Sequence, residues 1–189
     1  MRLNPVFPTF IGHFPFKSHK KYIHLFDDCT SMIDHSPDNW SSNLYTTFHE
    51  DEEIFDIAEL RYDLSNKVIG ELNIPSTYVK DLWYNVYHNG SYQERHHHCE
   101  PGIIMSGIYF YRNASSPVFW NRDASIISSM GYNKYLCDSP FANIRMGDNL
   151  TIEVSDGDII IFPPDLEHEV PRYEGNSPRI TFSFNISLI

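Results

Sequence analysis

The sequence has few cysteines, no long hydrophobic run and no secretory signal. Its 189 residues include three cysteines, an odd number without the spacing of a disulfide framework, which favours a reducing compartment. No apolar run approaches the roughly 18 residues of a membrane span, and residues 1–17 lack the charged start, apolar stretch and cleavage site of a signal peptide. We therefore expect a soluble, cytoplasmic protein without a membrane partner.

Basic residues are also scarce. Lys and Arg total 14 against 25 Asp and Glu, which gives a formal net charge of −11. Such a charge repels phosphate backbones and anionic membrane surfaces. We therefore expect no nucleic-acid partner.

Aromatic residues are, by contrast, abundant. The chain has 13 Phe, 12 Tyr and 3 Trp, and 41% of its residues are hydrophobic, which excludes a disordered chain. Its length of 189 residues predicts one domain over 1–189, long enough for a sizeable core. The aromatic side chains can fill that core and also leave room for a homodimer interface.

The first 80 residues carry edge-strand and helical patterns. Residues 5–15 mix extended-type residues with prolines, which places them at a sheet edge. Apolar residues then recur at helical spacing from Ser18 to Ile33, and a second helical stripe runs from Ile54 to Leu72, starting near the acidic cluster 50–53. We expect both helices to cover one face of a sheet.

From residue 81 onward, short aromatic and β-branched runs are separated by turn residues, which predicts an antiparallel sandwich or barrel. The predicted strands are 83–87, 103–111, 118–120, 150–154, 159–162 and 179–186. Residues 123–146 have weak periodicity, and we predict a loop that covers an active site, with an ordinary connection as the alternative.

Three polar side chains of this half have the chemistry of a metal site. In an extended backbone, His98 and Glu100 project to one face and supply two ligands of a facial triad that suits Fe(II). The pair His96 and His98 fits one face equally well. His168 follows an apolar strand and Pro163-Pro164, where the chain turns back toward the sheet, so it can supply the third ligand or be a structural histidine.

The last predicted strand has a polar face and an apolar face. Arg179, Thr181, Ser183 and Asn185 alternate with aromatic and β-branched residues. The polar face either points to solvent or lines the interior, where the planar guanidinium of Arg179 can hold a carboxylate in a bidentate manner.

Taken in order, His98-Cys-Glu100, Ser106-Gly-Ile-Tyr-Phe-Tyr111, Gly157-Asp-Ile-Ile-Ile-Phe-Pro163, His168 and the strand from Arg179 resemble the Fe(II)/2-oxoglutarate-dependent oxygenases. More narrowly, they resemble an uncharacterised group found in phages and marine bacteria, in which case the cytoplasm is that of the host. The resemblance covers about residues 83–189.

This resemblance implies a mainly β fold with helices (α+β). The expected architecture is a double-stranded β-helix, also called a jelly roll and similar to cupins, with two or more N-terminal helices packed on one sheet. Residues 1–80 would form the N-terminal strand and supporting helices, and residues 81–189 the jelly-roll core with the metal site.

The resemblance also implies a ligand set. His98, Glu100 and His168 would bind Fe(II) as catalytic residues, and Arg179 would bind the distal carboxylate of 2-oxoglutarate. In the nearest relatives, an alignment on Pro101 places a second histidine where this chain has Glu100, so His96 with His98 stays an open alternative. The candidates for the second contact to 2-oxoglutarate are Asn85, Tyr87, Tyr109, Thr181 and Ser183.

The activity that follows is a dioxygenase reaction. Dioxygen and 2-oxoglutarate would yield succinate and CO2 while an unidentified small molecule or peptide side chain is hydroxylated. One alternative is a cupin-type metalloprotein that does not use 2-oxoglutarate, and another is a non-catalytic jelly-roll protein with a binding or structural role. Arg179 favours the oxygenase, because a cupin without 2-oxoglutarate does not need an interior arginine on its last strand.

Overall fold

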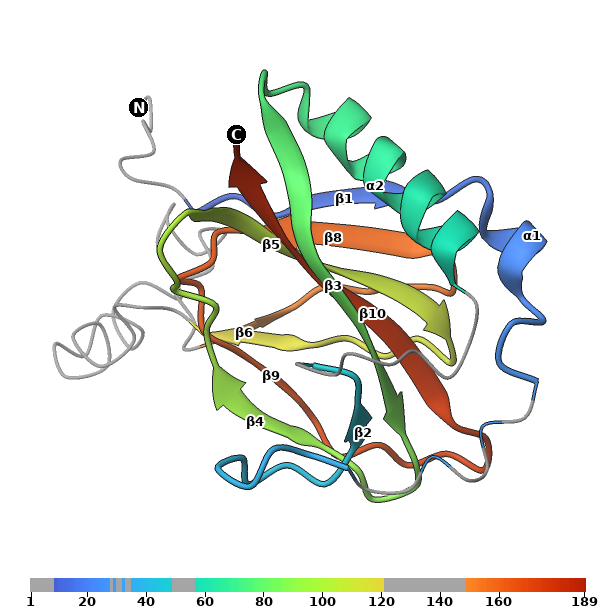
Figure 1. Ribbon diagram of the computed structural model, residues 1–189. Helices are drawn as coiled ribbons and strands as arrows, with labels where there is room; N and C mark the ends of the chain where they lie inside the picture. Colours follow the sequence, from blue (N-terminus) through green and yellow to red (C-terminus); the bar gives the residue numbers. More distant parts are fainter. Residues whose placement is uncertain (1–8, 28, 30–31, 33–34, 49–56, 121–148) are drawn as a thin grey trace, which may run out of the picture.

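The computed structural model describes residues 9–27, 29, 32, 35–48, 57–120 and 149–189 (Figure 1). Its elements are β1 (Gly12–Pro15), α1 (His19–Tyr22), β2 (Tyr45–Thr46), α2 (Ala58–Leu72), β3 (Thr77–Tyr87), β4 (Gln93–His96), β5 (Ile103–Arg112), β6 (Val118–Trp120), β7 (Asn149–Thr151), β8 (Asp158–Phe162), β9 (His168–Val170) and β10 (Arg179–Leu188). The predicted cover loop at 123–146 lies outside these described residues.

The strands form two antiparallel sheets. The larger has the order β1-β8-β5-β10-β3-β2, and the smaller has the order β4-β9-β6-β7. This arrangement confirms the predicted mainly β fold with antiparallel sheets. The edge position of β1 also agrees with the prolines of the first segment, since a proline cannot donate a ladder hydrogen bond.

Side chains of the larger sheet alternate between two environments. On β10, Ile180, Phe182 and Phe184 belong to the main apolar cluster, which also contains three buried side chains of α2. Arg179 and Thr181 therefore point to the opposite side, toward the smaller sheet. The alternation on β10 separates an apolar core from a polar interior.

The helices differ from the prediction. The stripe from Ile54 to Leu72 forms α2 over Ala58–Leu72, which lies over the larger sheet (Figure 1). The stripe from Ser18 to Ile33 was expected to form one long helix, and this prediction was wrong, because α1 ends at Tyr22 and residues 23–26 form turns. Phe26 is nevertheless fully buried, so the apolar spacing reflects burial of single side chains rather than a continuous helix.

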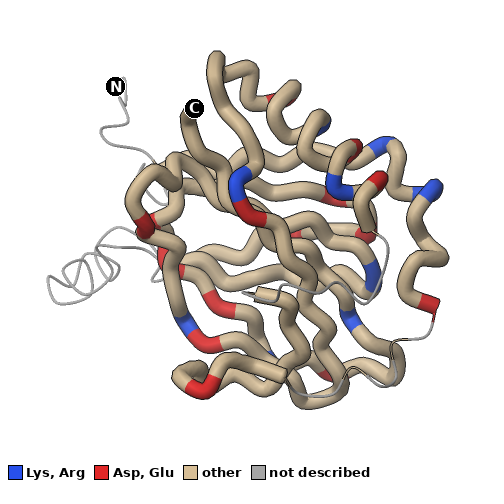
Figure 2. The backbone as a smooth tube through the Cα atoms, viewed as in Figure 1, with Lys and Arg blue, Asp and Glu red and all other residues tan. Residues whose placement is uncertain are grey.

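Charged residues are spread over both helices, several strands and the connecting turns (Figure 2). None of the helices in the described part of the chain is long and apolar enough to span a bilayer.

Candidate metal centre

Three histidines gather between the two sheets. One potential ligand atom from each of His96, His98 and His168 lies within 4.8 Å of the others. The ring centroids of His96 and His168 are 4.2 Å apart, and those of His98 and His168 are 5.2 Å apart. Three imidazoles at this spacing can bind one metal ion, since metal–nitrogen distances near 2 Å place ligand atoms about 3–4 Å apart.

Strand pairing brings the histidines together. His96 is the last residue of β4 and pairs directly with His168, the first residue of β9. His98 lies just beyond β4, where its backbone N–H donates a 2.7 Å hydrogen bond to the carbonyl of Pro164. The Pro163-Pro164 turn therefore helps to hold both His98 and the start of β9.

Two of the rings have one nitrogen engaged by the backbone. Nδ1 of His168 lies 3.0 Å from the carbonyl oxygen of Leu166, and Nδ1 of His96 lies 2.7 Å from that of Glu94. A carbonyl oxygen can only accept, so both Nδ1 atoms carry the proton and the Nε2 lone pairs are available to a metal. The backbone thus orients two ligands before any metal arrives.

The surroundings of these rings favour their neutral form. Burial, together with the smaller effect of His96, lowers the pKa of His98 to about 3. Burial also lowers the pKa of His96, and it lowers that of His168 well below its usual value. A neutral imidazole is the form that binds a metal ion.

Glu100 lies apart from this group. Its side chain is 52% exposed, and its carboxylate is 3.8 Å from Nζ of Lys80. The prediction assumed an extended chain from His98 to Glu100, whereas β4 ends at His96 and a turn at residues 101–102 leads into β5. The structure thus brings His96, and not Glu100, beside His98 and His168.

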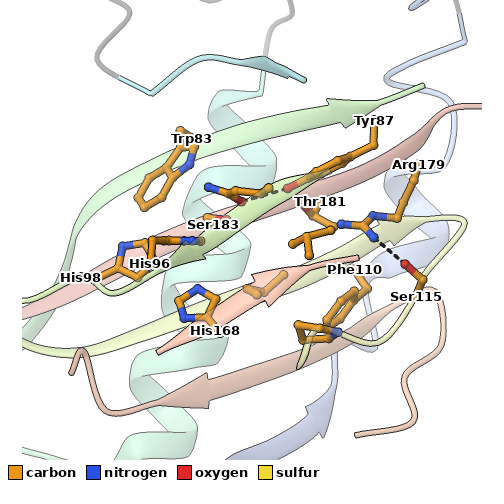
Figure 3. Close-up of a pocket in the computed structure, with 14 residues that line it drawn as sticks. Trp83, Tyr87, His96, His98, Phe110, Ser115, His168, Arg179, Thr181 and Ser183 are labelled. Atoms are coloured by element: carbon orange, nitrogen blue, oxygen red, sulfur yellow. Dashed lines mark hydrogen bonds between the residues drawn. The ribbon is translucent and has the colours of Figure 1, made fainter. Parts of the chain in front are cut away.

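Arg179 lies at the other end of the cavity that the histidines line (Figure 3). Its side chain is buried, with its guanidinium carbon 4.0 Å from the ring centroid of Tyr87, and it donates a hydrogen bond to the hydroxyl of Ser115. Among the described residues, its Nε has no hydrogen-bond partner and no carboxylate forms an ion pair with its guanidinium. Burial lowers the pKa of Arg179, and Tyr87 opposes that effect.

A buried guanidinium without a carboxylate partner is a candidate anion site. An isolated buried charge is costly, and charge-assisted bonds to a carboxylate recover that cost. The free volume of this inner cavity is about 10 Å³, roughly the space that one water molecule requires. The cavity is therefore narrow in the present arrangement of side chains.

The other predicted contacts divide between the two faces of the larger sheet. Tyr87, Thr181 and Ser183 line the inner cavity. Asn85 donates a 3.1 Å hydrogen bond to the hydroxyl of Ser183. Tyr109 lies on the opposite face in the main apolar cluster. The structure therefore brings four of these five predicted residues to the side that carries Arg179.

Other residues of the cavity were not singled out from the sequence. Ser115 reaches Arg179 from the loop between β5 and β6, and Gln93 accepts a 3.1 Å hydrogen bond from the hydroxyl of Tyr87. Trp83 was recognised only as part of a strand, but its ring lies 5.8 Å from that of His98. The period-two alternation from Tyr87 back to Trp83 is a signal that could have placed Trp83 at the site.

Solved structures share this fold at low sequence identity. HygX from Streptomyces hygroscopicus, crystallised with nickel and 2-oxoglutarate, gives a TM-score of 0.60 at 10% identity over 95% of this chain and 83% of its own. The viral collagen prolyl hydroxylase of Paramecium Bursaria Chlorella virus-1, a 2-oxoglutarate complex, gives 0.54 at 13% identity over 95% and 96%. A Pseudomonas putida prolyl-4-hydroxylase gives 0.51 at 11% identity over 95% and 92%.

These likenesses support the predicted jelly-roll architecture. Among curated proteins, no sequence matches this chain.

A family model described as "Putative 2OG-Fe(II) oxygenase" matches residues 81–185, which is more than half of the chain. The match confirms the predicted family and, with it, the predicted cofactors Fe(II) and 2-oxoglutarate. The three histidines provide a donor set that could bind the metal. The chain belongs to the 2OG-Fe(II) oxygenase family.

Proposed function

We propose that this protein is a 2-oxoglutarate-dependent dioxygenase that hydroxylates a C–H bond of its substrate and releases succinate and CO2. In this proposal His96, His98 and His168 hold Fe(II), and Arg179 binds the distal carboxylate of 2-oxoglutarate. His96 thus takes the place expected for Glu100.

One observation carries the proposal. Three neutral, metal-competent imidazoles lie at one end of a cavity, and at the other end lies a buried guanidinium that has no carboxylate partner in the described part of the chain (Figure 3). A ketoacid that also carries a second carboxylate matches both ends.

The chain's own residues have separate roles. Arg179 orients the cosubstrate, and the stacked ring of Tyr87 limits the positions that the guanidinium can take. The inner cavity has a free volume of only about 10 Å³, so side chains must move before the cosubstrate can bind. Ser115 is a candidate to move, because its hydroxyl now accepts a hydrogen bond from Arg179. When bound, Fe(II) supplies the redox chemistry with dioxygen.

The substrate class in this proposal stays open between a small molecule and a peptide side chain. HygX has also been crystallised with hygromycin B bound, and two similar structures are named prolyl hydroxylases. Both kinds of substrate are therefore compatible with this fold, and the neighbours do not select one for this chain.

A second candidate is a metalloprotein that binds its metal through the three histidines and does not use 2-oxoglutarate. The observation that favours it is the absence of a carboxylate from the histidine group found among the described residues. Arg179 argues against it, because a protein that does not bind 2-oxoglutarate would have no anion to pair with this buried guanidinium.

Anaerobic titration separates the two candidates. Metal-free protein receives one equivalent of Fe(II) and then 2-oxoglutarate, while visible absorption is recorded. The proposed function predicts a metal-to-ligand charge-transfer band that appears only with both, followed by succinate formation when dioxygen is admitted. Binding of Fe(II) without any change on addition of 2-oxoglutarate would favour the second candidate.

A further inference from the structure

A second cavity lies outside the histidine group. It has a volume of about 230 Å³ and shares Trp83, Gln93, His96 and His98 with the inner cavity. Because the two cavities share these side chains, a molecule in the outer cavity would lie beside His96 and His98, two of the proposed metal ligands. This outer cavity is therefore the candidate place for the substrate.

Aromatic rings form one wall of the outer cavity. The rings of Trp40 and Phe48 are stacked with centroids 5.6 Å apart, and Phe48 lies 4.9 Å from Trp83. Trp83 in turn lies 5.8 Å from His98. A row of neighbouring aromatic rings thus leads from the loop that carries Trp40 to the histidine group.

The charged side chains that line this cavity are acidic. They are Glu94 on β4 and Glu100 in the segment that follows it, and no described Lys or Arg is among the lining residues. Acidic positions are visible along this part of the chain in Figure 2. The carboxylate of Glu94 is held by the backbone N–H of Ser41 at 3.1 Å and by the hydroxyl of Ser42.

The nearest basic side chains contact Glu100 and acidic groups outside the cavity, but not Glu94. Arg95 bonds to Glu167 and lies over Trp120, with 4.6 Å between the guanidinium carbon and the ring centroid, so it is engaged on another part of the surface. Nζ of Lys80 lies 3.8 Å from the carboxylate of Glu100 and 3.8 Å from that of Asp81, so it offsets part of their charge. Glu94 forms no ion pair with a Lys or Arg of the described residues.

The inner end of the cavity carries an unused hydrogen-bond donor. Trp83 is only 5% exposed, and its indole N–H has no acceptor among the described residues. Buried donors are normally paired. An ammonium group cannot accept this hydrogen bond, so only an acceptor such as an amide carbonyl of the bound molecule would pair with it.

We infer that the outer cavity binds the organic ammonium group of the substrate. The inference rests on the proposed function and adds a substrate class to it. Aromatic faces attract ammonium groups through their quadrupoles. The carboxylate of Glu94 adds a favourable field, and Glu100, which lies 3.8 Å from Lys80, adds a smaller one. The volume of about 230 Å³ is below that of typical drug-sized sites, so it suits an alkylammonium chain such as a lysine side chain or a small free amine.

Direct binding tests the inference with defined probes. Nα-acetyl-lysine methylamide carries the ammonium group, and Nα-acetyl-norleucine methylamide has a similar chain without it. Titration calorimetry and tryptophan fluorescence on the Fe(II)- and 2-oxoglutarate-treated protein are expected to show that the lysine probe binds at least about tenfold more tightly. Equal affinity, or tighter binding of the norleucine probe, overturns the inference.

Variants of the wall locate the binding. Trp40→Leu and Glu100→Gln are each expected to weaken the lysine probe at least about threefold and to leave the norleucine probe unchanged. Trp40→Phe is the matched control, since it keeps an aromatic face and is expected to retain most of the preference. Unchanged preference for the lysine probe in both Trp40→Leu and Glu100→Gln would place its binding elsewhere and overturn the inference.

Two further measurements distinguish a free amine from a peptide lysine, and failure of the cavity assignment from failure of the proposed function. Butylamine replaces the lysine probe in one arm, and tighter binding by either probe identifies a free amine or a peptide lysine as the source of the same ammonium chemistry. The same preparation is tested for the charge-transfer band. A preference for the ammonium probe without the band supports the cavity assignment and rejects the dioxygenase, whereas a band without the preference rejects the cavity assignment alone.

Discussion

His96 and His168 are direct partners across the β4–β9 ladder, and their ring centroids lie 4.2 Å apart. Residues directly opposite each other in an antiparallel pair have adjacent side chains on one face. The register of a short ladder therefore fixes which histidines meet. A shift of one residue in β4 would turn His96 away from His168.

Replacement of His96 tests the ligand set. His96→Ala is expected to weaken Fe(II) binding by at least about 100-fold, because it removes one of three donors, and loss of a mere supporting partner typically costs 10–100-fold. Glu100→Ala is expected to change Fe(II) affinity by less than about threefold, since exposed ion pairs contribute little. Anaerobic titration with Fe(II), or with Co(II) as a spectroscopic substitute, measures both.

The Glu100→Ala variant also serves as the control for general damage near β4. If it lost Fe(II) while His96→Ala retained it, the ligand set would be His98, Glu100 and His168, as the family resemblance first implied.

Replacement of Arg179 tests the cosubstrate site. Arg179→Ala is expected to weaken 2-oxoglutarate binding by about 2–5 kcal/mol, the usual cost of truncating one partner of a buried charge pair. Fe(II) affinity should stay unchanged, because the guanidinium lies at the far end of the cavity (Figure 3). Under nitrogen, titration of the metal-free variant with Fe(II) gives the metal affinity, and calorimetric titration of the Fe(II)-loaded variant with 2-oxoglutarate gives the cosubstrate affinity.

Tyr87→Phe is the matched control for Arg179→Ala. The hydroxyl of Tyr87 bonds to Gln93, while its ring carries the contact with Arg179. The variant keeps that ring, so we expect a smaller loss of 2-oxoglutarate affinity. An Arg179→Ala variant with unchanged affinity would refute the role assigned to the arginine.

Much of the larger sheet could be predicted because its strands carry their own pattern. The alternation from Arg179 to Ile186 places apolar side chains on one face, and β10 covers Arg179–Leu188. Trp83–Tyr87 and Ile159–Phe162 likewise lie within β3 and β8. In these segments local pattern and tertiary burial agree.

The smaller sheet was harder to predict. Gln93–His96 and His168–Val170 are short and polar, and their strand conformation depends on pairing with each other. The order of motifs pointed to His98, His168 and Arg179, which the structure places around one cavity. The end of β4 at His96 decided which side chain joins the histidines, and no local pattern specifies that end.

Gly107 explains part of the Ser-Gly strand motif. A Cβ at this position would lie 2.3 Å from Cζ of Phe184 and 2.7 Å from the carbonyl oxygen of Ile160. Backbone cannot yield as a side-chain tip can, so Gly107→Ala is expected to destabilise the protein by about 1–3 kcal/mol or more. Urea unfolding followed by circular dichroism measures this loss.

The same substitution at Gly70 is the control. Gly70 lies in α2 with nothing within 4 Å of an added Cβ. Gly70→Ala is therefore expected to stabilise the protein by about 0.5–1 kcal/mol, because alanine loses less backbone entropy in a helix. If Gly107→Ala and Gly70→Ala changed the urea midpoint in the same direction, the change in Gly107→Ala could not be assigned to steric contact.

His19 provides a prediction about pH. Its Nδ1 lies 2.7 Å from the hydroxyl of Tyr109, and burial lowers the pKa of His19, with Asp156 opposing. A lowered pKa in the folded state means that the unfolded chain binds more protons as pH falls below about 6.5. Stability from this group is therefore complete above pH 6.5 and is lost as pH falls toward the folded-state pKa.

The His19→Gln variant isolates this contribution, because glutamine can still hydrogen-bond to Tyr109 but does not titrate. The drop in urea midpoint between pH 7.5 and pH 5 should be smaller in the variant than in the parent protein. His24→Gln is the control, because the side chain of His24 is 78% exposed. This variant is expected to show the same drop in urea midpoint as the parent protein. An equal drop in His19→Gln and the parent would show that protonation of His19 does not contribute to acid sensitivity.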